Sequence, residues 1–205
     1  ATCAYIKETG NYDFLKKEIP FYEKNKEGKA IEKGTVLEHL SRSIDFTYSN
    51  KGVHGLPLLG FADWNDCVNL RAGAESAMIA NKYGTAINEL TDILNYIGDK
   101  DMAAKFQGYY SEMKEAVNKH AWDGEWFIRY FDYDGQPVGS KANDKGKIFT
   151  NGQSWSVISG FAENDKATKE SLNDGWLHTG DMVKKDQDGF LYIVDRKKNM
   201  FISGG

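Results

Sequence analysis

Hydrophobic positions recur at spacings of three and four residues in several stretches of this chain, a pattern that predicts amphipathic helices. The clearest stretch covers residues 79–97 and ends at Gly98. Its predicted apolar face consists of Ile79, Tyr83, Ile87, Leu90, Leu94 and Ile97. A second helix, predicted from Met102 onwards, has an apolar face of Phe106, Tyr109, Met113 and Val117. We expect one core to contain Ile79, Tyr83, Leu90, Phe106 and Met113.

Three weaker patterns predict further helices. Residues 1–9 resemble the last turns of a helix, which Gly10 ends. Another helix is predicted after Thr35, because Thr35 and Glu38 have the spacing of a capping box. Its apolar face contains Val36, Leu40, Ile44 and Thr47. Residues 151–162 predict one more buried helix, whereas residues 11–30 are polar and rich in turn formers, with Pro20 as a breaker.

Two stretches lack the helical period. Residues 125–139, EWFIRYFDYDGQPVG, alternate between apolar and polar positions around an Asp-Gly pair, which predicts a hairpin. After about residue 165 the pattern is one of short strands around the turn DQDG. The sequence contains no internal repeat, so we expect a mainly α-helical fold followed by a small β unit.

Composition excludes several classes of protein. The chain has 205 residues, of which 40% are hydrophobic, and a net charge of −4. Its Lys and Arg residues are scattered, so we expect no nucleic-acid partner. No apolar run approaches the roughly 18 residues of a membrane span, and no signal peptide is recognisable. Cys3 and Cys67 form no metal-binding pattern, and we interpret them as reduced thiols of a cytoplasmic protein.

The residues best suited to chemistry lie in a long loop, GVHGLPLLGFADWNDCVNL at 52–70. The whole loop is expected to run from Asn50 to Leu70, and its first half contains five turn formers: Asn50, Gly52, Gly55, Pro57 and Gly60. Asp63 and Asp66 then enclose Trp64, and aromatic side chains beside carboxylates are typical of sugar sites. Alternative roles exist, because turn Asp residues often cap backbone N–H groups and Trp64 suits a core.

Other polar residues favour structural roles. We interpret His54 as a hydrogen-bonding residue of the loop rather than a base, and Cys67 as an inert small hydrophobe. Glu75 stands at the start of the strongest helix, where a first-turn carboxylate is favoured by the helix dipole. For Gln153 and Trp155, core packing is the default and a position facing a site is the alternative.

Up to about Ala162, the chain resembles the cellobiose and chitobiose phosphorylase family of inverting glycoside phosphorylases. Five motifs in order carry the resemblance: GTVLEHLSRSIDF, GVHGLPLLGFADWNDCVNL, GAESAMIANKYG, AWDGEWFIRYFDYDGQPVGS and NGQSWSVISGFA. The family's catalytic domain is an (α/α)6 barrel, so the resemblance implies a partial (α/α)6 barrel with a hairpin insertion. It covers only the middle of that barrel, without the family's N-terminal β-sandwich or its phosphate-binding positions.

The resemblance also implies a reaction. Such enzymes cleave a β-linked disaccharide with inorganic phosphate and release a sugar 1-phosphate. Phosphate attacks the anomeric carbon directly, so one general acid suffices, whereas an inverting hydrolase needs two carboxylates. The matching acid is Asp66, Trp64 would bind sugar, and Asp63 would bind a sugar hydroxyl or anchor the loop. The implied partners are a disaccharide and phosphate, with no other cofactor and no metal; a homo-oligomer stays open.

The C-terminal residues resemble a second family, the adenylate-forming acyl-CoA synthetases and ligases. The resemblance rests on GWLHTGD, DGFLYIVDRKK and ISGG. It implies that Asp181 and Arg196 hold the ribose of an adenylate derived from ATP, and that Lys198 is a hinge. Carboxylates suit paired hydroxyl groups, and hinges lie at element boundaries. The alternative is that these residues only close a β-hairpin.

The two resemblances meet near residues 162–166, because NDKATKESL suits the second family better. We therefore predict two parts, residues 1–162 from a phosphorylase barrel and residues 163–205 from an adenylate-forming domain. We expect the chain by itself to be inactive. Two rival hypotheses are an acyl-CoA synthetase piece with a helical carrier, and a non-catalytic carbohydrate-binding helical module.

Overall fold

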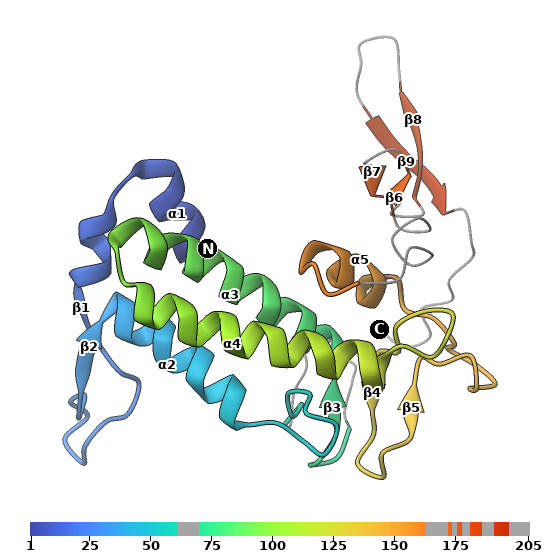
Figure 1. Ribbon diagram of the computed structural model, residues 1–205, viewed down its shortest axis with the longest axis horizontal. Helices are drawn as coiled ribbons and strands as arrows, with labels where there is room; N and C mark the ends of the chain where they lie inside the picture. Colours follow the sequence, from blue (N-terminus) through green and yellow to red (C-terminus); the bar gives the residue numbers. More distant parts are fainter. Residues whose placement is uncertain (61–69, 163–171, 174–175, 178–180, 186–190, 197–205) are drawn as a thin grey trace.

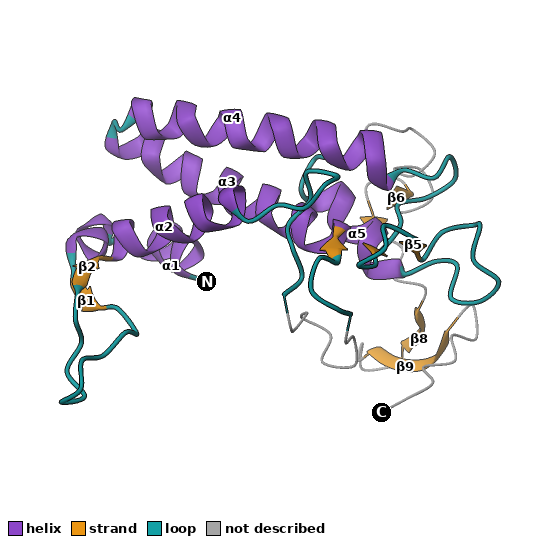
Figure 2. Ribbon diagram, turned by 90° about the horizontal axis from the view of Figure 1, so that it is seen from below, coloured by secondary structure: helices purple, strands orange, loops and turns teal. Residues whose placement is uncertain are grey.

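The computed structural model describes residues 1–60 and 70–162, together with the backbone of four short strands between residues 172 and 196. Its centre is helix α3 (Ala77–Ile97), which contacts α1 (Thr2–Thr9), α2 (Val36–Ser49), α4 (Lys100–Ala116) and α5 (Thr150–Ile158). Figures 1 and 2 show α3 and α4 lying side by side along most of their length, with α2 beside them. The part of the chain that the structure describes is thus mainly helical, as the sequence predicts.

Three helix ends lie at the residues that the sequence indicated, whereas α3 begins at Ala77, α4 begins at Lys100 and α5 ends at Ile158 rather than at residue 162. Thr35 and Glu38 form the predicted capping box of α2. Gly10 and Gly98 end α1 and α3 with φ values of 67° and 85°, a left-handed conformation that costs glycine no steric strain. At the turn between α3 and α4, the side chain of Asp99 accepts a hydrogen bond from the backbone N–H of Met102 at 3.1 Å.

One large core joins α3 to α4, to Ile44 of α2 and to Phe161, which follows α5. Its largest members are Tyr83, Ile87, Leu90, Leu94, Phe106, Met113, Phe127 and Phe161. The prediction for Ile79 and Ile97 was wrong, because Ile79 is only half-buried and Ile97 is 40% exposed. Met78, the neighbour of Ile79, is fully buried, and near the C-terminal end of α3 both Ile93 and the predicted Leu94 are buried.

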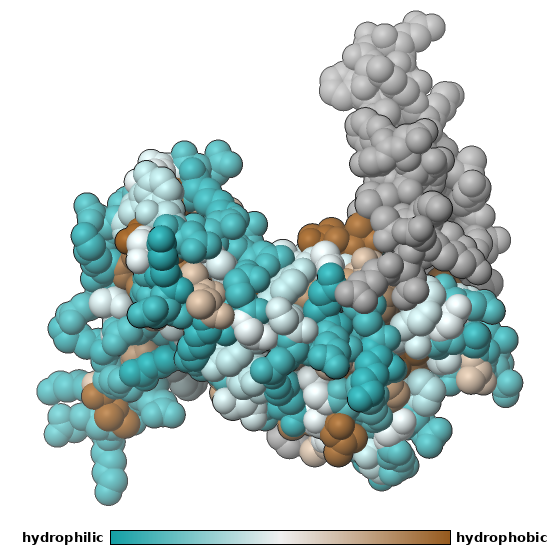
Figure 3. Space-filling model, in the orientation of Figure 1, coloured by the Kyte–Doolittle hydropathy of each residue, from teal (hydrophilic) through white to brown (hydrophobic). Residues whose placement is uncertain are grey.

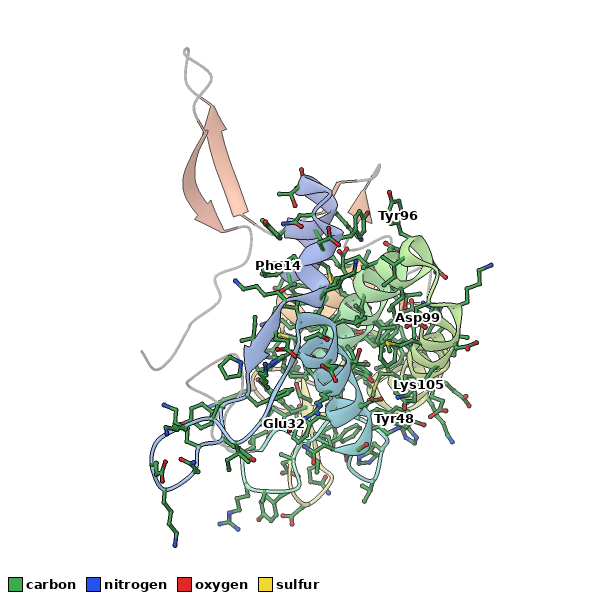
Figure 4. The ribbon with its side chains drawn as sticks, turned by 90° about the vertical axis from the view of Figure 1, so that its left-hand side faces the viewer. Phe14, Glu32, Tyr48, Tyr96, Asp99 and Lys105 are labelled. Atoms are coloured by element: carbon green, nitrogen blue, oxygen red, sulfur yellow. The ribbon has the colours of Figure 1, made fainter. Side chains whose placement is uncertain are left out.

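Ile93 belongs to a second, smaller core. It packs with Ile6 of α1, Leu15 and Val36. Leu15 lies in the 3-10 helix η1 (Tyr12–Lys16), and the Tyr12 ring stacks on Tyr96 at a centroid distance of 4.2 Å. Figure 4 shows Tyr96 and Phe14 on the same end of the molecule.

Residues 17–35 form a paired arm, whereas the sequence showed only a polar, turn-rich stretch. Strands β1 (Glu18–Pro20) and β2 (Lys33–Thr35) pair antiparallel, with Ile19 opposite Gly34. The ring of Phe21 stacks on His39 of α2 at 3.8 Å and also lies under the guanidinium of Arg42. These contacts attach the arm to α2, and Figure 2 shows the arm extending away from the start of that helix.

Between α4 and α5 the chain builds a small sheet. Helix α4 continues into the π-helical turn η2 (Val117–Ala121). Strands β4 (Tyr130–Phe131) and β5 (Pro137–Val138) then pair antiparallel within residues 125–139. Strand β3 (Glu75–Ser76), which immediately precedes α3, pairs with β4 and gives the order β3-β4-β5.

The C-terminal residues contain short strands, in agreement with their sequence pattern. Strand β6 (Leu172–Asn173) pairs with β7 (Trp176–Leu177), and β8 (Asp181–Lys185) pairs with β9 (Leu191–Arg196). Both pairs are antiparallel. No helix among the described residues is long and apolar enough to cross a membrane.

Candidate functional site

Both ends of the predicted acid-bearing loop are attached to the edge of the small sheet. On the outgoing side, the N–H of Leu59 donates to the carbonyl of Ala74 at 2.8 Å. On the return side, the N–H of Ser76 donates to the carbonyl of Pro57 at 2.9 Å. Leu59 and Ala74 are buried together with Tyr130 of β4. The two ends of the segment 60–73 therefore lie next to each other. We call the flanking residues the loop stem, with residues 50–59 as its outgoing half and residues 74–76 as its return half.

A buried carboxylate lies inside this stem. Glu75 is only 1% exposed, although glutamate side chains usually lie at the protein surface. Its oxygens accept hydrogen bonds from the backbone N–H of His54, at 3.2 and 3.1 Å, and from the backbone N–H of Leu56 at 3.1 Å. The prediction of a first-turn helix charge was wrong: Glu75 lies in β3, and Ser76 is the residue that caps α3.

His54 completes the group around this carboxylate. Its ring Nδ1 lies 2.7 Å from Oε1 of Glu75, so the interpretation of His54 as a hydrogen-bonding loop residue is confirmed. The ring lies flat on Phe131, with centroids 3.8 Å apart and planes 13° apart. The centroids of the His54 and His120 rings are 5.5 Å apart, with their planes inclined at 64°. Burial is the main cause that lowers the pKa of His120, and electrostatic interactions with Lys119 and His54 lower that pKa further.

An arginine that the sequence did not single out lies in the same region. Arg129 is 1% exposed and immediately precedes β4. Its backbone joins the sheet to the start of α3, because its carbonyl accepts from the N–H of Ala77 at 3.2 Å and its N–H donates to Val138 at 2.8 Å. The guanidinium carbon is 4.4 Å from the centroid of the Tyr130 ring. A buried cation thus lies next to the sheet to which the stem is attached.

Gln153 has a structural role, as the default interpretation held. Its amide oxygen accepts from the backbone N–H of Phe127 at 2.9 Å, and its amide nitrogen donates to the carbonyl of the same residue at 2.7 Å. This pair attaches α5 to the strand segment that leads into β4. Gln153 is 9% exposed, and both ends of its amide are used.

Trp155, by contrast, is half-buried and lines a pocket of about 590 Å³. The other walls of the pocket come from α1, from Leu40 and Ile44 of α2, and from α3. Lys82 of α3 stands 5.3 Å from the centroid of the Trp155 ring. Figure 3 shows the helical body hollowed between α1 and α5, where this pocket lies. The same pocket includes Cys3, whose thiol pKa is raised, chiefly by burial.

The structure describes only some of the residues that were predicted to have a functional role. Asp63, Trp64 and Asp66 lie outside the described residues, and so do Cys67 and Lys198. Asp181 and Arg196 lie in β8 and β9, where they are register partners directly opposite each other. Among the described residues, no group of three or more His, Cys, Asp or Glu side chains has the arrangement of a metal site.

Comparison with known proteins identifies the class. Residues 1–174 match the family model described as the glycosyl hydrolase 94 superfamily, catalytic domain. The chain is similar to a solabiose phosphorylase of Paenibacillus borealis, with 35% identity over 168 residues, or 80% of this chain and 21% of that protein. It is also similar to an N,N'-diacetylchitobiose phosphorylase of Vibrio proteolyticus, with 30% identity over 166 residues, or 80% of this chain and 20% of that protein.

These matches define the described helices as part of the catalytic domain of a carbohydrate-active enzyme. The chain belongs to the glycosyl hydrolase 94 superfamily. The resemblance to cellobiose and chitobiose phosphorylases is thereby confirmed. The chain spans about a fifth of the length of the phosphorylases that it matches.

The second resemblance is also supported. A 2-succinylbenzoate–CoA ligase of Bacillus cytotoxicus is 45% identical over 64 residues, which cover 31% of this chain and 13% of the ligase. The family match to the glycosyl hydrolases extends to residue 174, beyond the predicted join at residues 162–166. The position of the join stays a prediction.

Proposed function

We propose that this chain supplies the acid-bearing part of an inverting disaccharide phosphorylase. The observation that carries the proposal is the family match over residues 1–174 together with the phosphorylase relatives. The fold is compatible with it, because the described residues are mainly helical and both ends of the segment that contains Asp66 are attached to the small sheet. We propose that these helices form part of an (α/α)6 barrel whose loops contribute to the substrate site.

In the proposed reaction, Asp66 donates its proton to the glycosidic oxygen as the bond between that oxygen and the anomeric carbon breaks. An oxygen of inorganic phosphate forms the new bond to the anomeric carbon from the opposite face, so the configuration inverts. The products are a sugar 1-phosphate and the released sugar. Phosphate is already an anion and needs no general base, which explains why one acidic residue suffices.

The remaining site residues have supporting roles in this proposal. Trp64 contacts the sugar ring, and Asp63 binds a sugar hydroxyl or anchors the loop. The disaccharide and phosphate are the proposed partners, and phosphate is a co-substrate rather than a cofactor. A cytoplasmic location agrees with the two cysteines of the sequence and stays a prediction, and the oligomeric state stays open.

The test uses a hybrid enzyme in which residues 1–162 replace the matching part of the Paenibacillus borealis relative. Release of sugar 1-phosphate from solabiose and phosphate is measured for the hybrid and for two variants. Asp66→Asn should lower the rate by at least about a hundredfold, the usual scale of general acid catalysis. Asp63→Asn is the matched control and should retain more activity. Retained activity in Asp66→Asn, with loss in Asp63→Asn, would show that the acid is the other carboxylate.

A second function is favoured for the C-terminal part by one observation of the structure. Asp181 and Arg196, which the resemblance to adenylate-forming ligases assigns to the ribose, are opposed across β8 and β9. The match to the ligase of Bacillus cytotoxicus supports the same proposal. Titration calorimetry of the chain with ATP, cellobiose and glucose separates the two functions. Heat with ATP that is lost in Asp181→Ala supports a retained nucleotide site, and its absence contradicts one.

A further inference from the structure

Glu75 and the outgoing half of the loop stem hold each other in place. A carboxylate removed from water costs free energy unless hydrogen-bond donors replace its hydration. For Glu75, the backbone N–H groups of His54 and Leu56 donate, and the His54 ring shares a further hydrogen bond with Oε1. The chain also passes close to the carboxylate, since a Cβ added at Gly52 would lie 2.3 Å from Cδ of Glu75. Residues 52–56 therefore wrap around this one side chain.

The wrapping connects the two halves of the stem. Glu75 belongs to the return half, two residues before α3 begins, whereas residues 52–56 belong to the outgoing half. The loop of residues 60–73 lies between these halves along the chain. A shift of the carboxylate relative to residues 52–56 therefore changes the separation of the two points from which the loop extends.

His54 adds a second connection, to the neighbouring strand. The Nδ1 atom of His54 and Oε1 of Glu75 lie 2.7 Å apart and share one hydrogen bond, while both Glu75 oxygens also accept from the stem backbone. The ring is held flat against Phe131, which is the register partner of Glu75 in β4. Hydrogen bonding from one side and ring stacking from another fix the orientation of His54. Glu75, His54 and Phe131 act as one unit, which we call the stem clamp.

We propose that Glu75 is a positioning residue for the acid-bearing loop and acts through His54 by means of the stem clamp. The proposal rests on the proposed function in one respect, since it takes Asp66 of that loop as the general acid. The clamp itself depends only on the contacts of Glu75, His54 and Phe131. A change in the clamp should therefore be detectable in the loop without any measurement of activity.

The experiment labels the full chain with 5-fluorotryptophan and records its ¹⁹F spectrum. Trp64 reports on the loop, and its resonance is assigned with Trp64→Phe. Glu75→Gln keeps the size of the side chain but replaces one acceptor oxygen with an NH2 group, which faces the N–H groups of the stem. His54→Gln removes the ring that stacks on Phe131. The matched control is Glu115→Gln, since Glu115 is an exposed residue of α4.

We expect Glu75→Gln and His54→Gln each to shift the Trp64 resonance by more than its line width. The double variant should shift it no further, because both substitutions break the same unit. The resonances of Trp122 and Trp155 should not move, and Glu115→Gln should move none. The proposal is overturned if the Trp64 resonance stays in place in Glu75→Gln while thermal stability falls. It is equally overturned if all resonances move together, since either result makes Glu75 a residue of general stability.

The outcome is independent of the assignment of the acid. If Asp66→Asn keeps full activity in the hybrid enzyme, the proposed function fails, yet a selective shift at Trp64 still supports the clamp. If Trp64 does not respond but Asp66→Asn is inactive, the acid is correct and the clamp is wrong.

Discussion

Replacement of Gly84 by alanine tests whether the packing of α3 against Phe161 limits the stability of the helical body. Gly84 lies in the middle of α3 and is buried. A Cβ at this position would lie 2.4, 2.7 and 3.0 Å from three atoms of the Phe161 ring. That ring is fully buried, and the backbone around it is fixed by hydrogen bonds from Phe161 N–H to Ser156 and from Asn118 to the Phe161 carbonyl. The ring therefore has little freedom to move away.

Two opposing effects determine the magnitude. Alanine in place of glycine within a helix stabilises by about 0.5–1 kcal/mol. Overpacking of a well-packed core costs typically about 1–3 kcal/mol. Gly108 of α4 is the matched control, because it is an exposed helical glycine and its added Cβ meets nothing within 4 Å. The gain from replacing a helical glycine with alanine is common to both variants. The difference between their free energies of unfolding, about 1–3 kcal/mol, therefore measures the cost of overpacking alone.

The assay is urea unfolding followed by circular dichroism, with the wild type, Gly84→Ala and Gly108→Ala compared at one temperature. Gly108→Ala should raise the free energy of unfolding and Gly84→Ala should lower it, with similar dependence on urea in all three. The reasoning is refuted if Gly84→Ala stabilises the chain as much as Gly108→Ala does. That result would mean that Phe161 yields freely and that this contact does not hold α5 against α3.

Three further predictions concern the whole chain. The free energy of unfolding should decrease as the pH falls below about 6.5, because the lowered pKa of His120 means that the unfolded state binds more protons than the folded state. His120→Asn should weaken this dependence, as measured by denaturant unfolding between about pH 7 and pH 5. The chain alone should release no sugar 1-phosphate from cellobiose and phosphate, and no pyrophosphate from a fatty acid and ATP; release of either above a control without protein contradicts this. Brief protease treatment should cut first between Glu163 and Asn173, where the sequence is polar, and earlier cleavage elsewhere argues against a join there.

Local signals in the sequence were sufficient for the helices. The capping box of Thr35 and Glu38 and the glycines at 10 and 98 act within one turn of the chain, so their effect does not depend on the rest of the fold. The same holds for the predicted family, because motifs are read directly from the residues. Periodicity also found the middle of the buried face of α3, from Tyr83 to Leu94.

Tertiary contacts decided what periodicity did not. Ile79 and Ile97 continue the apolar spacing of α3, but Ile79 is only half-buried and Ile97 is 40% exposed, whereas Met78 beside Ile79 is fully buried. Glu75 occupies a place where a helix-dipole role is reasonable from sequence alone. Its actual partners lie about twenty residues earlier in the chain, and only the pairing of residues 57–59 with residues 74–76 brings them together. The sequence around Arg129 did not indicate that this side chain is buried. Its burial depends on the packing of the folded chain and became visible only in the structure.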